Sequence, residues 1–378
     1  DIDGGSTDAC GIASIVLDKT DFDCADVGAN TVTLTVTDDN ANISTCTATV
    51  TVEDKVAPIA LCQNVSVQLD AAGAGSIVAS DVDAGSTDAC GFASLVLDAT
   101  DFTCTDVGAN TVTLTATDNN GNVSTCTATV TVEDKVAPIA LCQDLTIQLD
   151  AAGAASISAA AIDNGSNDAC GITSLALDIT DFDCADIGGN TVSLTATDNN
   201  GNSASCTATV TVEDNVVPIA LCQDITVQLT SLGQAFILPN MVDNGSSDAC
   251  GLTYELDITS FDCSAVTIPV AVELTVSDPS GNTASCSATV TVEDNIAPIA
   301  ICQDITVQLD AEGQANTNAT AIDAGSTDAC GIATIDLDQN SFGCAEVGPN
   351  TVQLTLTDIH GNISTCTATV TVEDDIAP

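Results

Sequence analysis

DNNGNSASCTATVTVEDNVVP, at residues 198–218, contains the signals that organise the whole chain. It combines a tight polar turn, a Cys, a strand in which Thr alternates with apolar residues, an acidic pair and a Pro. Near-copies of this stretch end at Pro58, Pro138, Pro298 and Pro378, so the pattern returns every 80 residues. A strict period of this length predicts a tandem array of small domains. We expect a partial repeat at 1–57 and full repeats at 58–137, 138–217, 218–297 and 298–378, the last ending where a further repeat starts.

The composition excludes several classes of function. The chain carries 54 acidic residues against three Lys and no Arg, for a net charge of -51. Phosphate groups are bound by Lys and Arg, so nucleic acid is excluded as a partner and docking on an anionic membrane surface is disfavoured. Such a charge is typical of disorder, but 45% of the residues are hydrophobic. They are mostly Val, Ile, Leu and Ala interleaved with Thr, which indicates β-structure.

The 19 cysteines fall at the same places in each repeat. Recurrent Cys at this density is typical of an oxidising environment, so we expect an extracellular or cell-surface location. No apolar run approaches the roughly 18 residues of a membrane-spanning helix, and we expect no direct membrane insertion. Cys10, Cys24 and Cys46 form a set whose first member is missing. We therefore expect the chain to be a segment of a longer secreted protein.

Within repeat 138–217, short strand patterns alternate with turn signals. The expected strands are 139–150 (as one strand or two), 155–163, 172–179, 191–198 and 203–214. The turn DNNGN at 198–202 is typical of a tight hairpin. Short strands at regular spacing predict an all-β fold: a linear array of Ig-like β-sandwich domains with an 80-residue period. The Ala-rich segment 151–162 is the one place where a helix is a competing interpretation.

Counting strand reversals assigns each loop to one end of the sandwich. We call the end where the chain arrives the upstream end, and the end where it leaves the downstream end. The loops at 164–171 and 198–202 return to the upstream end, whereas those at 149–153 and 181–190 lie at the downstream end. The downstream end of one repeat should therefore meet the upstream end of the next, across a short linker that Pro stiffens. Neighbouring repeats of the same chain are thus the first expected partners.

Four cysteines per repeat permit three pairings. In an Ig-like sandwich the first and last strands lie side by side, so the first Cys should pair with the fourth. These pairs are Cys62–Cys126, Cys142–Cys206, Cys222–Cys286 and Cys302–Cys366. The expected pairs of second with third Cys are Cys10–Cys24, Cys90–Cys104, Cys170–Cys184, Cys250–Cys263 and Cys330–Cys344. They require the segment between them to turn back, because a straight strand at about 3.3 Å per residue would hold the sulfurs apart. Metal binding by Cys is the rival interpretation, disfavoured by wide spacing without a CxxC pair.

Acidic residues converge on each predicted junction. In repeat 138–217 the upstream loops supply Asp163, Asp168 and Asp198, and the preceding linker supplies Glu133 and Asp134. Five carboxylates near one point repel one another unless a cation lies among them, and Ca²⁺ accepts about six to eight oxygen ligands in flexible geometry. We therefore predict Ca²⁺ at the junctions, with Mg²⁺ disfavoured by its stricter octahedral geometry. The equivalent residues are Glu53, Asp54, Asp83, Asp88, Asp118, Glu213, Asp214, Asp243, Asp248, Asp278, Glu293, Asp294, Asp323, Asp328 and Asp358.

Simple solvated turns are the competing interpretation of these acidic loops. Asp, Asn, Ser and Gly are the residues that any surface turn uses, and a repeated turn is copied whether or not it binds an ion. The stretches DIDGGSTD and DVDAGSTD have a slight likeness to an EF-hand loop. They lack the distal bidentate Glu and the flanking helices, which excludes that type of site.

The order of motifs along each repeat resembles a known family. APxALC, DACG, FxCxxxG, NTVxLTATDxxGN and CTATVTVED occur in the same order as in the hyalin-repeat (HYR) domain and its Ig-like relatives. The similarity covers the whole chain and is most specific in TVxLTATDxxGN and the terminal VxD–P. It looks most like the tandem copies in giant Bacteroidota surface proteins, including gliding-type adhesins exported by the type IX route. The resemblance implies an extracellular stalk or adhesive filament without enzymatic activity, and a Cys pair that corresponds to the first and fourth Cys here.

The sequence contains no recognisable catalytic constellation, which would need a base or nucleophile poised in a pocket. His360, the single His, replaces the Asn found at Asn120 and Asn200 in the same hairpin turn, and we expect it to be solvent-exposed. Tyr254 and Met241 are single substitutions in the most divergent repeat. Paired carboxylates recur at the ends of every repeat, where they imply no sugar cleft. We predict that the protein is not an enzyme.

Three functions are consistent with these features. The leading hypothesis is a structural stalk or filament segment of a cell-surface adhesin, locked by disulfides and stiffened by Ca²⁺. The first alternative is a multivalent binding array for surface glycans, in which avidity adds up weak contacts. The scarcity of aromatic residues, 2% of the chain, counts against sugar binding. The second alternative is a self-assembling extracellular fibre or sheath in which copies of the chain pack laterally. The surface ligand stays unknown.

Overall fold

The computed structural model describes residues 1–377 and consists mainly of β-strands, so the predicted all-β fold is confirmed. The predicted start of a further repeat at Pro378 lies outside the described residues. Contacts divide the chain into two compact units. One comprises Asp1–Leu145, Ile157–Thr180 and Thr191–Val210, and the other comprises Thr146–Ser156, Asp181–Asn190 and the chain from Thr211 onward.

Repeat 58–137 shows the arrangement that recurs along the chain. Its four-stranded sheet has the order β4 (Val65–Gln68), β9 (Val123–Glu133), β8 (Gly108–Asp118) and β6 (Phe92–Leu97). Its two-stranded sheet consists of β5 (Ala74–Ser76) and β7 (Asp101–Thr103). The first strand, β4, runs parallel to the last, β9, whereas the other pairs are antiparallel. This side-by-side placement of first and last strands is the one expected of an Ig-like sandwich.

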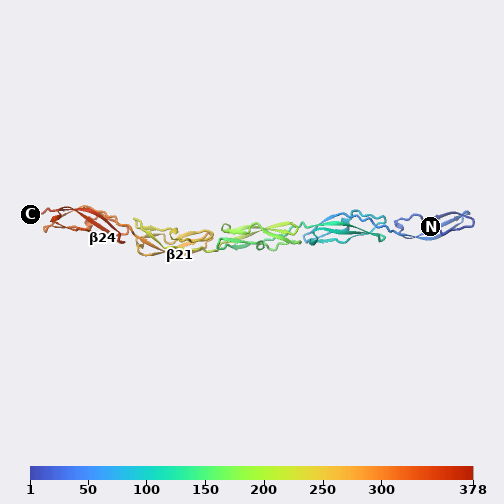
Figure 1. Cartoon of the computed structure of the whole chain (residues 1–378), viewed down its shortest axis with the longest axis horizontal. Coiled ribbons are helices and arrows are strands. Elements are labelled where there is room, and N and C mark those ends of the chain that lie inside the picture. The colour runs from blue at the N-terminus through green and yellow to red at the C-terminus, as the bar shows by residue number, and fades with distance from the viewer. Residues whose placement is uncertain (378) are drawn as a thin grey trace. The chain divides into compact units, whose positions relative to one another are not determined.

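The other repeats use the same elements, and Figure 1 shows each group of strands in one continuous range of the colour bar. Repeat 138–217 contains β10 (Leu145–Gln148), β11 (Ala154–Ser156), β12 (Ile172–Leu177), β13 (Asp181–Asp183), β14 (Gly188–Asp198) and β15 (Ser203–Glu213). Repeat 218–297 contains β16 (Ile225–Gln228), β17 (Gln234–Phe236), β18 (Thr253–Leu256), β19 (Ser260–Asp262), β20 (Val270–Ser277) and β21 (Thr283–Glu293). The last repeat contains β22 (Ile305–Gln308), β23 (Gln314–Asn316), β24 (Ile332–Leu337), β25 (Ser341–Gly343), β26 (Gly348–Asp358) and β27 (Ile363–Glu373). The partial repeat has a three-stranded sheet of β1 (Ile12–Leu17), β2 (Gly28–Asp38) and β3 (Ile43–Val52).

Helix is limited to single turns. The Ala-rich segment does form one, α2 (Ala159–Ile162), and its counterparts are α1 (Ala79–Val82), α3 (Pro239–Val242) and α4 (Ala319–Ile322). Short 3-10 turns precede the long hairpins: η1 (Cys24–Asp26), η2 (Cys104–Asp106), η3 (Cys184–Asp186), η4 (Cys263–Ala265) and η5 (Cys344–Glu346). Among residues 1–377, no helix has the length and apolar character needed to cross a membrane.

The core of each sandwich follows from strand alternation. In β8 and β9, side chains such as Val112, Leu114 and Val130 are fully buried, and the Thr residues between them point outward. Successive side chains of a strand face opposite sides, so the alternating Thr/Val pattern divides directly into an inner and an outer face. Phe102, on β7 of the smaller sheet, packs onto this core and is 4% exposed. Phe182, Phe261 and Phe342 are buried at the same place, so one aromatic side chain holds the two layers together in each full repeat.

Candidate cation sites at the junctions between repeats

We number the junctions between consecutive repeats first to fourth in chain order, and all four lie within one or the other compact unit. At each, an Asn at the end of the hairpin turn donates from Nδ2 to a linker carbonyl of the preceding repeat. Asn122 contacts the Asp54 carbonyl at 3.1 Å and Asn202 contacts that of Asp134 at 3.1 Å. Asn282 and Asn362 make the same contact with Asp214 and Asp294. Sequence reasoning missed this role, although the recurrence of Asn at the end of DxxGN was its signal.

The four complete pairs of first with fourth Cys are confirmed: Cys62–Cys126, Cys142–Cys206, Cys222–Cys286 and Cys302–Cys366. The predicted pairs of second with third Cys are wrong: Cys10–Cys24, Cys90–Cys104, Cys170–Cys184, Cys250–Cys263 and Cys330–Cys344. The third Cys instead bonds to the second Cys of the following repeat, as Cys24–Cys90, Cys104–Cys170, Cys184–Cys250 and Cys263–Cys330. Among the described residues, Cys10, Cys46 and Cys344 are free and exposed.

The physical reason for this pairing is the extended strand between the two cysteines. β6 separates Cys90 from Cys104 and carries the chain from the upstream to the downstream end of its repeat. Cys104, in η2, therefore lies beside the following repeat, where its Cα is 5.1 Å from that of Cys170. Each junction is thus covalently bridged, and the expectation that downstream and upstream ends meet is confirmed.

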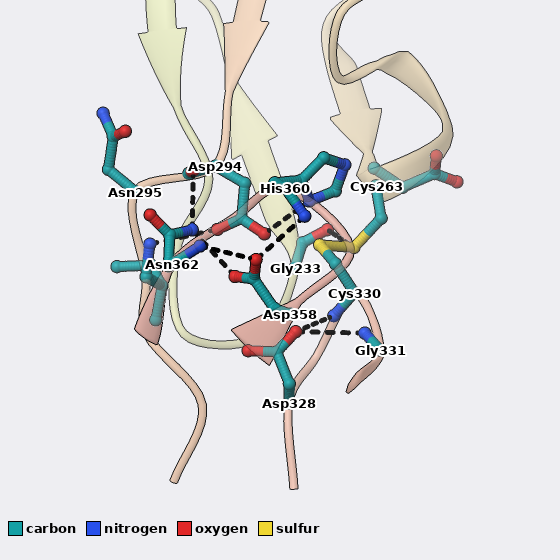
Figure 2. Close-up of polar contacts among 12 residues, drawn as sticks. Gly233, Cys263, Asp294, Asn295, Asp328, Cys330, Gly331, Asp358, His360 and Asn362 are labelled. Carbon is teal, nitrogen blue, oxygen red and sulfur yellow. Dashed lines mark hydrogen bonds and ion pairs between the residues drawn. A yellow bond between two sulfur atoms is a disulfide. The ribbon is translucent and has the colours of Figure 1, made fainter. Parts of the chain in front are cut away.

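The turn glycine on the downstream side shows how closely the repeats approach. Gly233 has φ of +71°, and a Cβ built there would lie 2.9 Å from Cys263 Sγ and 3.2 Å from the Cβ of Ala329 in the next repeat. Real Cβ atoms essentially never approach another atom that closely, and a positive φ is strained for other residues. Only glycine therefore allows this turn to pack beside the disulfide (Figure 2).

Part of each predicted acidic set comes together. Carboxylate oxygens lie within 4.8 Å of one another in Asp54, Asp88 and Asp118 at the first junction, and in Asp294, Asp328 and Asp358 at the fourth. At the second and third junctions the corresponding pairs are Asp134 with Asp168 and Asp214 with Asp248. Nearby Cys sulfurs belong to disulfides and are therefore not thiolate ligands.

The linker aspartates of the second and third junctions each bury an oxygen without a partner. Asp134 is 8% exposed and Asp214 is 6% exposed. In each, Oδ1 accepts from the backbone N–H two residues later, at 3.0 Å. Their Oδ2 atoms are buried and have no hydrogen-bond partner among residues 1–377. A buried carboxylate oxygen left unpaired is costly, so these two atoms are the positions where a cation would be most stabilising.

The hairpin aspartates add a buried negative charge that the turn itself stabilises. Asp198 is 1% exposed, and its Oδ1 accepts from the backbone N–H groups of Asn200 and Asn202, both at 2.8 Å. Its Oδ2 accepts from Asn202 Nδ2. Burial acts to raise the pKa of Asp198, but these hydrogen bonds outweigh it and the pKa lies below its ordinary value. Asp118 and Asp358 show the same balance. Their carboxylates are therefore ionised at neutral pH.

Ten of the predicted ligands lie outside these clusters within the part of the chain described here: Asp83, Asp163, Asp198, Asp243, Asp278, Asp323, Glu53, Glu133, Glu213 and Glu293. Asp163 stays in its own loop, where Oδ1 accepts from Ser166 N–H at 2.9 Å. Glu213 accepts from Gln148 Nε2 at 2.6 Å on the side of its own repeat. Adjacent side chains of an extended segment face opposite sides, so Glu213 turns away when Asp214 turns inward. The clusters therefore contain fewer carboxylates than the five predicted for each junction, and the full ligand set stays a prediction.

His360 is not solvent-exposed, so that prediction is wrong. Its side chain is 12% exposed, and Nδ1 lies 2.9 Å from Oδ2 of Asp294, whose side chain is 3% exposed. Figure 2 shows the imidazole turned toward Asp294, with Asp358 beside them. The turn places it there, because the backbone N–H of His360 also donates to Asp358 Oδ1 at 2.8 Å. The sequence of the turn at 358–362 contains no feature that predicts the burial of His360.

Comparison with known proteins finds a weak similarity to one curated protein. The chain is 29% identical over 363 residues to Hyalin of Strongylocentrotus purpuratus, which covers 92% of this chain and 30% of Hyalin. The chain thus spans about a third of the length of this relative. No protein-family model matches it.

Among solved structures, similar chains are tandem arrays of β-domains. The Protocadherin GammaB4 extracellular domain matches 97% of this chain and 78% of its own, with a TM-score of 0.30 and 16% identity. Immunoglobulin domains 1–5 of Sidekick-1 match 92% of this chain and 86% of their own, with a TM-score of 0.28 and 10% identity. Scores this low carry no argument about function, which has to come from the junctions themselves.

Proposed function

We propose that the chain is a stalk or filament segment of an extracellular adhesin, of the Bacteroidota gliding-adhesin type, that resists bending and pulling at its junctions. The observation that carries this proposal is the set of four disulfides joining consecutive repeats. Flexible multidomain chains leave their linkers free, whereas here a covalent bond and an Asn–carbonyl hydrogen bond both span each linker. This double attachment suits a part that transmits force between a surface and a tip.

The disulfide is a strong constraint for domains of this size. Cys104 and Cys170 are separated by 66 residues, and closing a loop of that length contributes about 4 kcal/mol on the chain-entropy model. That is comparable with the whole stability of a small domain, roughly 5–15 kcal/mol. The bridge therefore also couples unfolding of one repeat to that of its neighbour.

We further propose that the junction clusters bind Ca²⁺. Support comes from the buried, unpaired Oδ2 atoms of Asp134 and Asp214, each close to a second carboxylate. The available donors are carboxylate and carbonyl oxygens, which hard cations prefer, and the wide spacing suits Ca²⁺ better than the tight octahedron of Mg²⁺. With a net charge of -51, divalent cations at junctions would also lower the repulsion between repeats.

Small-angle scattering of the full chain tests both parts of the proposal. We expect chelation of Ca²⁺ to reduce the maximum dimension slightly, because the disulfides still hold the junctions. Chelator and reductant together should reduce it much further and broaden the distance distribution. An unchanged maximum dimension after both treatments would contradict a stalk stiffened at its junctions. If the reductant changes the maximum dimension and the chelator does not, the disulfides stiffen the junctions and the proposed Ca²⁺ does not.

A second candidate, a glycan-binding array, is favoured by one observation and only in repeat 218–297. A surface pocket of about 400 Å³ lies over β17 and β19, lined by Phe236, Gln234, Ser260 and Asp262. Phe236 is 64% exposed, and the equivalent residue of repeat 138–217 is Ser156. An exposed ring beside amide, hydroxyl and carboxylate groups suits the apolar face and hydroxyls of a neutral sugar.

Glycan-array binding of the full chain tests this candidate. Phe236→Ser should abolish any binding, because it introduces the side chain found in repeats 58–137 and 138–217. Tyr254→Ser, at an exposed residue outside the pocket, is the matched control and should have no effect. Binding that survives Phe236→Ser would remove this repeat as the site.

A further inference from the structure

The residue before the glycine of the hairpin turn distinguishes the fourth junction from the others. Asn120, Asn200 and Ser280 occupy this position at the first three junctions and are exposed to solvent. His360 occupies it at the fourth and is folded inward, 12% exposed. The four turns otherwise share the Asp, Gly and final Asn, and all four donate from that Asn to the linker carbonyl. The change in side chain is therefore a local one on a common frame.

His360 contacts the one atom that is left unpaired at the second and third junctions. Oδ2 is buried without a partner in Asp134 and Asp214, but in Asp294 it lies 2.9 Å from His360 Nδ1. We propose that the His360 imidazole takes the place of the cation at the fourth junction, so that this junction is closed without Ca²⁺. This inference rests on the proposed Ca²⁺ sites of the other junctions.

Three physical arguments support the substitution. An N–H at Nδ1 satisfies the buried oxygen of Asp294, and both the neutral Nδ1–H tautomer and the imidazolium supply it. A ring held at hydrogen-bond distance from Asp294 occupies the space in which an ion would contact that oxygen. Nitrogen is also a poor ligand for Ca²⁺, which selects oxygen donors.

The surrounding carboxylates are satisfied by the protein as well. Asp358 accepts from the backbone N–H groups of His360 and Asn362 on Oδ1 and from Asn362 Nδ2 on Oδ2. Asp328 accepts on Oδ1 from the backbone N–H groups of Cys330 and Gly331 (Figure 2). Among the described residues, no carboxylate oxygen of this junction is buried without a hydrogen-bond partner. The array would then have one junction whose closure does not depend on the Ca²⁺ concentration.

Hydrogen exchange with mass spectrometry on the full, oxidised chain tests this, because it reads each junction separately. Exchange is compared in Ca²⁺ and in chelator for peptides containing 198–202 and 358–362. We expect the chelator to remove protection at 198–202 and to leave 358–362 unchanged. In His360→Asn, which introduces the residue of the first and second junctions, protection at 358–362 should become sensitive to the chelator. In Asn200→His, the matched reverse change, 198–202 should lose that sensitivity.

The outcomes separate this inference from the proposed Ca²⁺ sites. Loss of protection at both turns of the unsubstituted chain would overturn the inference and leave the Ca²⁺ sites standing. If the chelator leaves protection unchanged at every junction in all three chains, both the inference about His360 and the proposed Ca²⁺ sites are overturned. If Zn²⁺ in place of Ca²⁺ increases protection at 358–362, His360 is a ligand and not a substitute for the ion, which also overturns the inference.

Discussion

Asn202 shows how one side chain serves both the local turn and the junction. Its Nδ2 donates to Asp198 Oδ2 at 2.8 Å and to the Asp134 carbonyl at 3.1 Å, and its own N–H donates to Asp198 Oδ1. The two contacts with Asp198 close the hairpin, and the contact with the Asp134 carbonyl attaches the preceding linker. The residue therefore converts a turn, which any surface loop possesses, into a connection between repeats.

Asn202→Ala should destabilise the second junction by about 1–3 kcal/mol, because the buried Oδ2 of Asp198 and the linker carbonyl of Asp134 lose the Nδ2 donor. Exchange of the amides in 198–202 should speed up accordingly. Asn167→Ala is a suitable control, since Asn167 Nδ2 donates to the carbonyl of Gly165 in its own loop and, among residues 1–377, to no linker carbonyl. Equal effects of the two substitutions would show that the contact with Asp134 is not stabilising.

Asp163 should make the stability of the 164–171 loop depend on pH in the acid range. Hydrogen bonds from the side chain and backbone of Ser166 hold the pKa of Asp163 below its ordinary value. A carboxyl whose pKa is lower in the folded state contributes stability above its unfolded pKa and loses it as the pH falls through the folded value. We therefore expect the loop to be insensitive to pH between 7 and about 5, and to loosen well below pH 4.

Acid titration followed by proteolysis of the 164–171 loop measures this effect. Ser166→Ala removes a donor to Asp163, so loosening should begin at a higher pH than in the unsubstituted chain. Asp163→Asn removes the titrating group and should flatten the dependence. An identical acid midpoint for all three chains would contradict the role of this carboxylate.

At the scale of elements, the strands decide which cysteines meet. One strand separates the second Cys of each full repeat from the third: β6, β12, β18 or β24. This strand runs along the sandwich from one end to the other. The segment was expected to fold back, but its alternating apolar residues pair it with the long hairpin strand. Pairing across the junction follows from this extension.

Peptide mapping without reduction should therefore find the peptide containing Cys104 linked to the one containing Cys170, and Cys142 linked to Cys206. A Cys90–Cys104 linkage would contradict the structure. Replacing both Cys104 and Cys170 by Ser should lower the stability of the bridged repeats by about 2–5 kcal/mol. Replacing the exposed, free Cys46 by Ser is the control and should have little effect.

At the scale of the whole molecule, charge is the dominant opposing term. A net charge of -51 on 378 residues repels itself, and this repulsion is screened over about 10 Å at 0.1 M salt. Without Ca²⁺, the midpoint of thermal unfolding should rise as NaCl increases from 10 to 500 mM. Saturating Ca²⁺ should reduce this dependence, and scanning calorimetry measures both. A midpoint that falls with salt would show that self-repulsion does not limit stability.

The residues alone determined the 80-residue period of the sequence, the all-β fold and the pairing of the first with the fourth Cys. These features follow from local period, alternation and turn chemistry, which a single chain displays directly. Only the tertiary structure decided the disulfides between repeats, the inward turn of Asp134 against the outward turn of Glu133, and the burial of His360. Each depends on contacts between the downstream end of one repeat and the upstream end of the next. The period of the sequence does not show which residues face each other there.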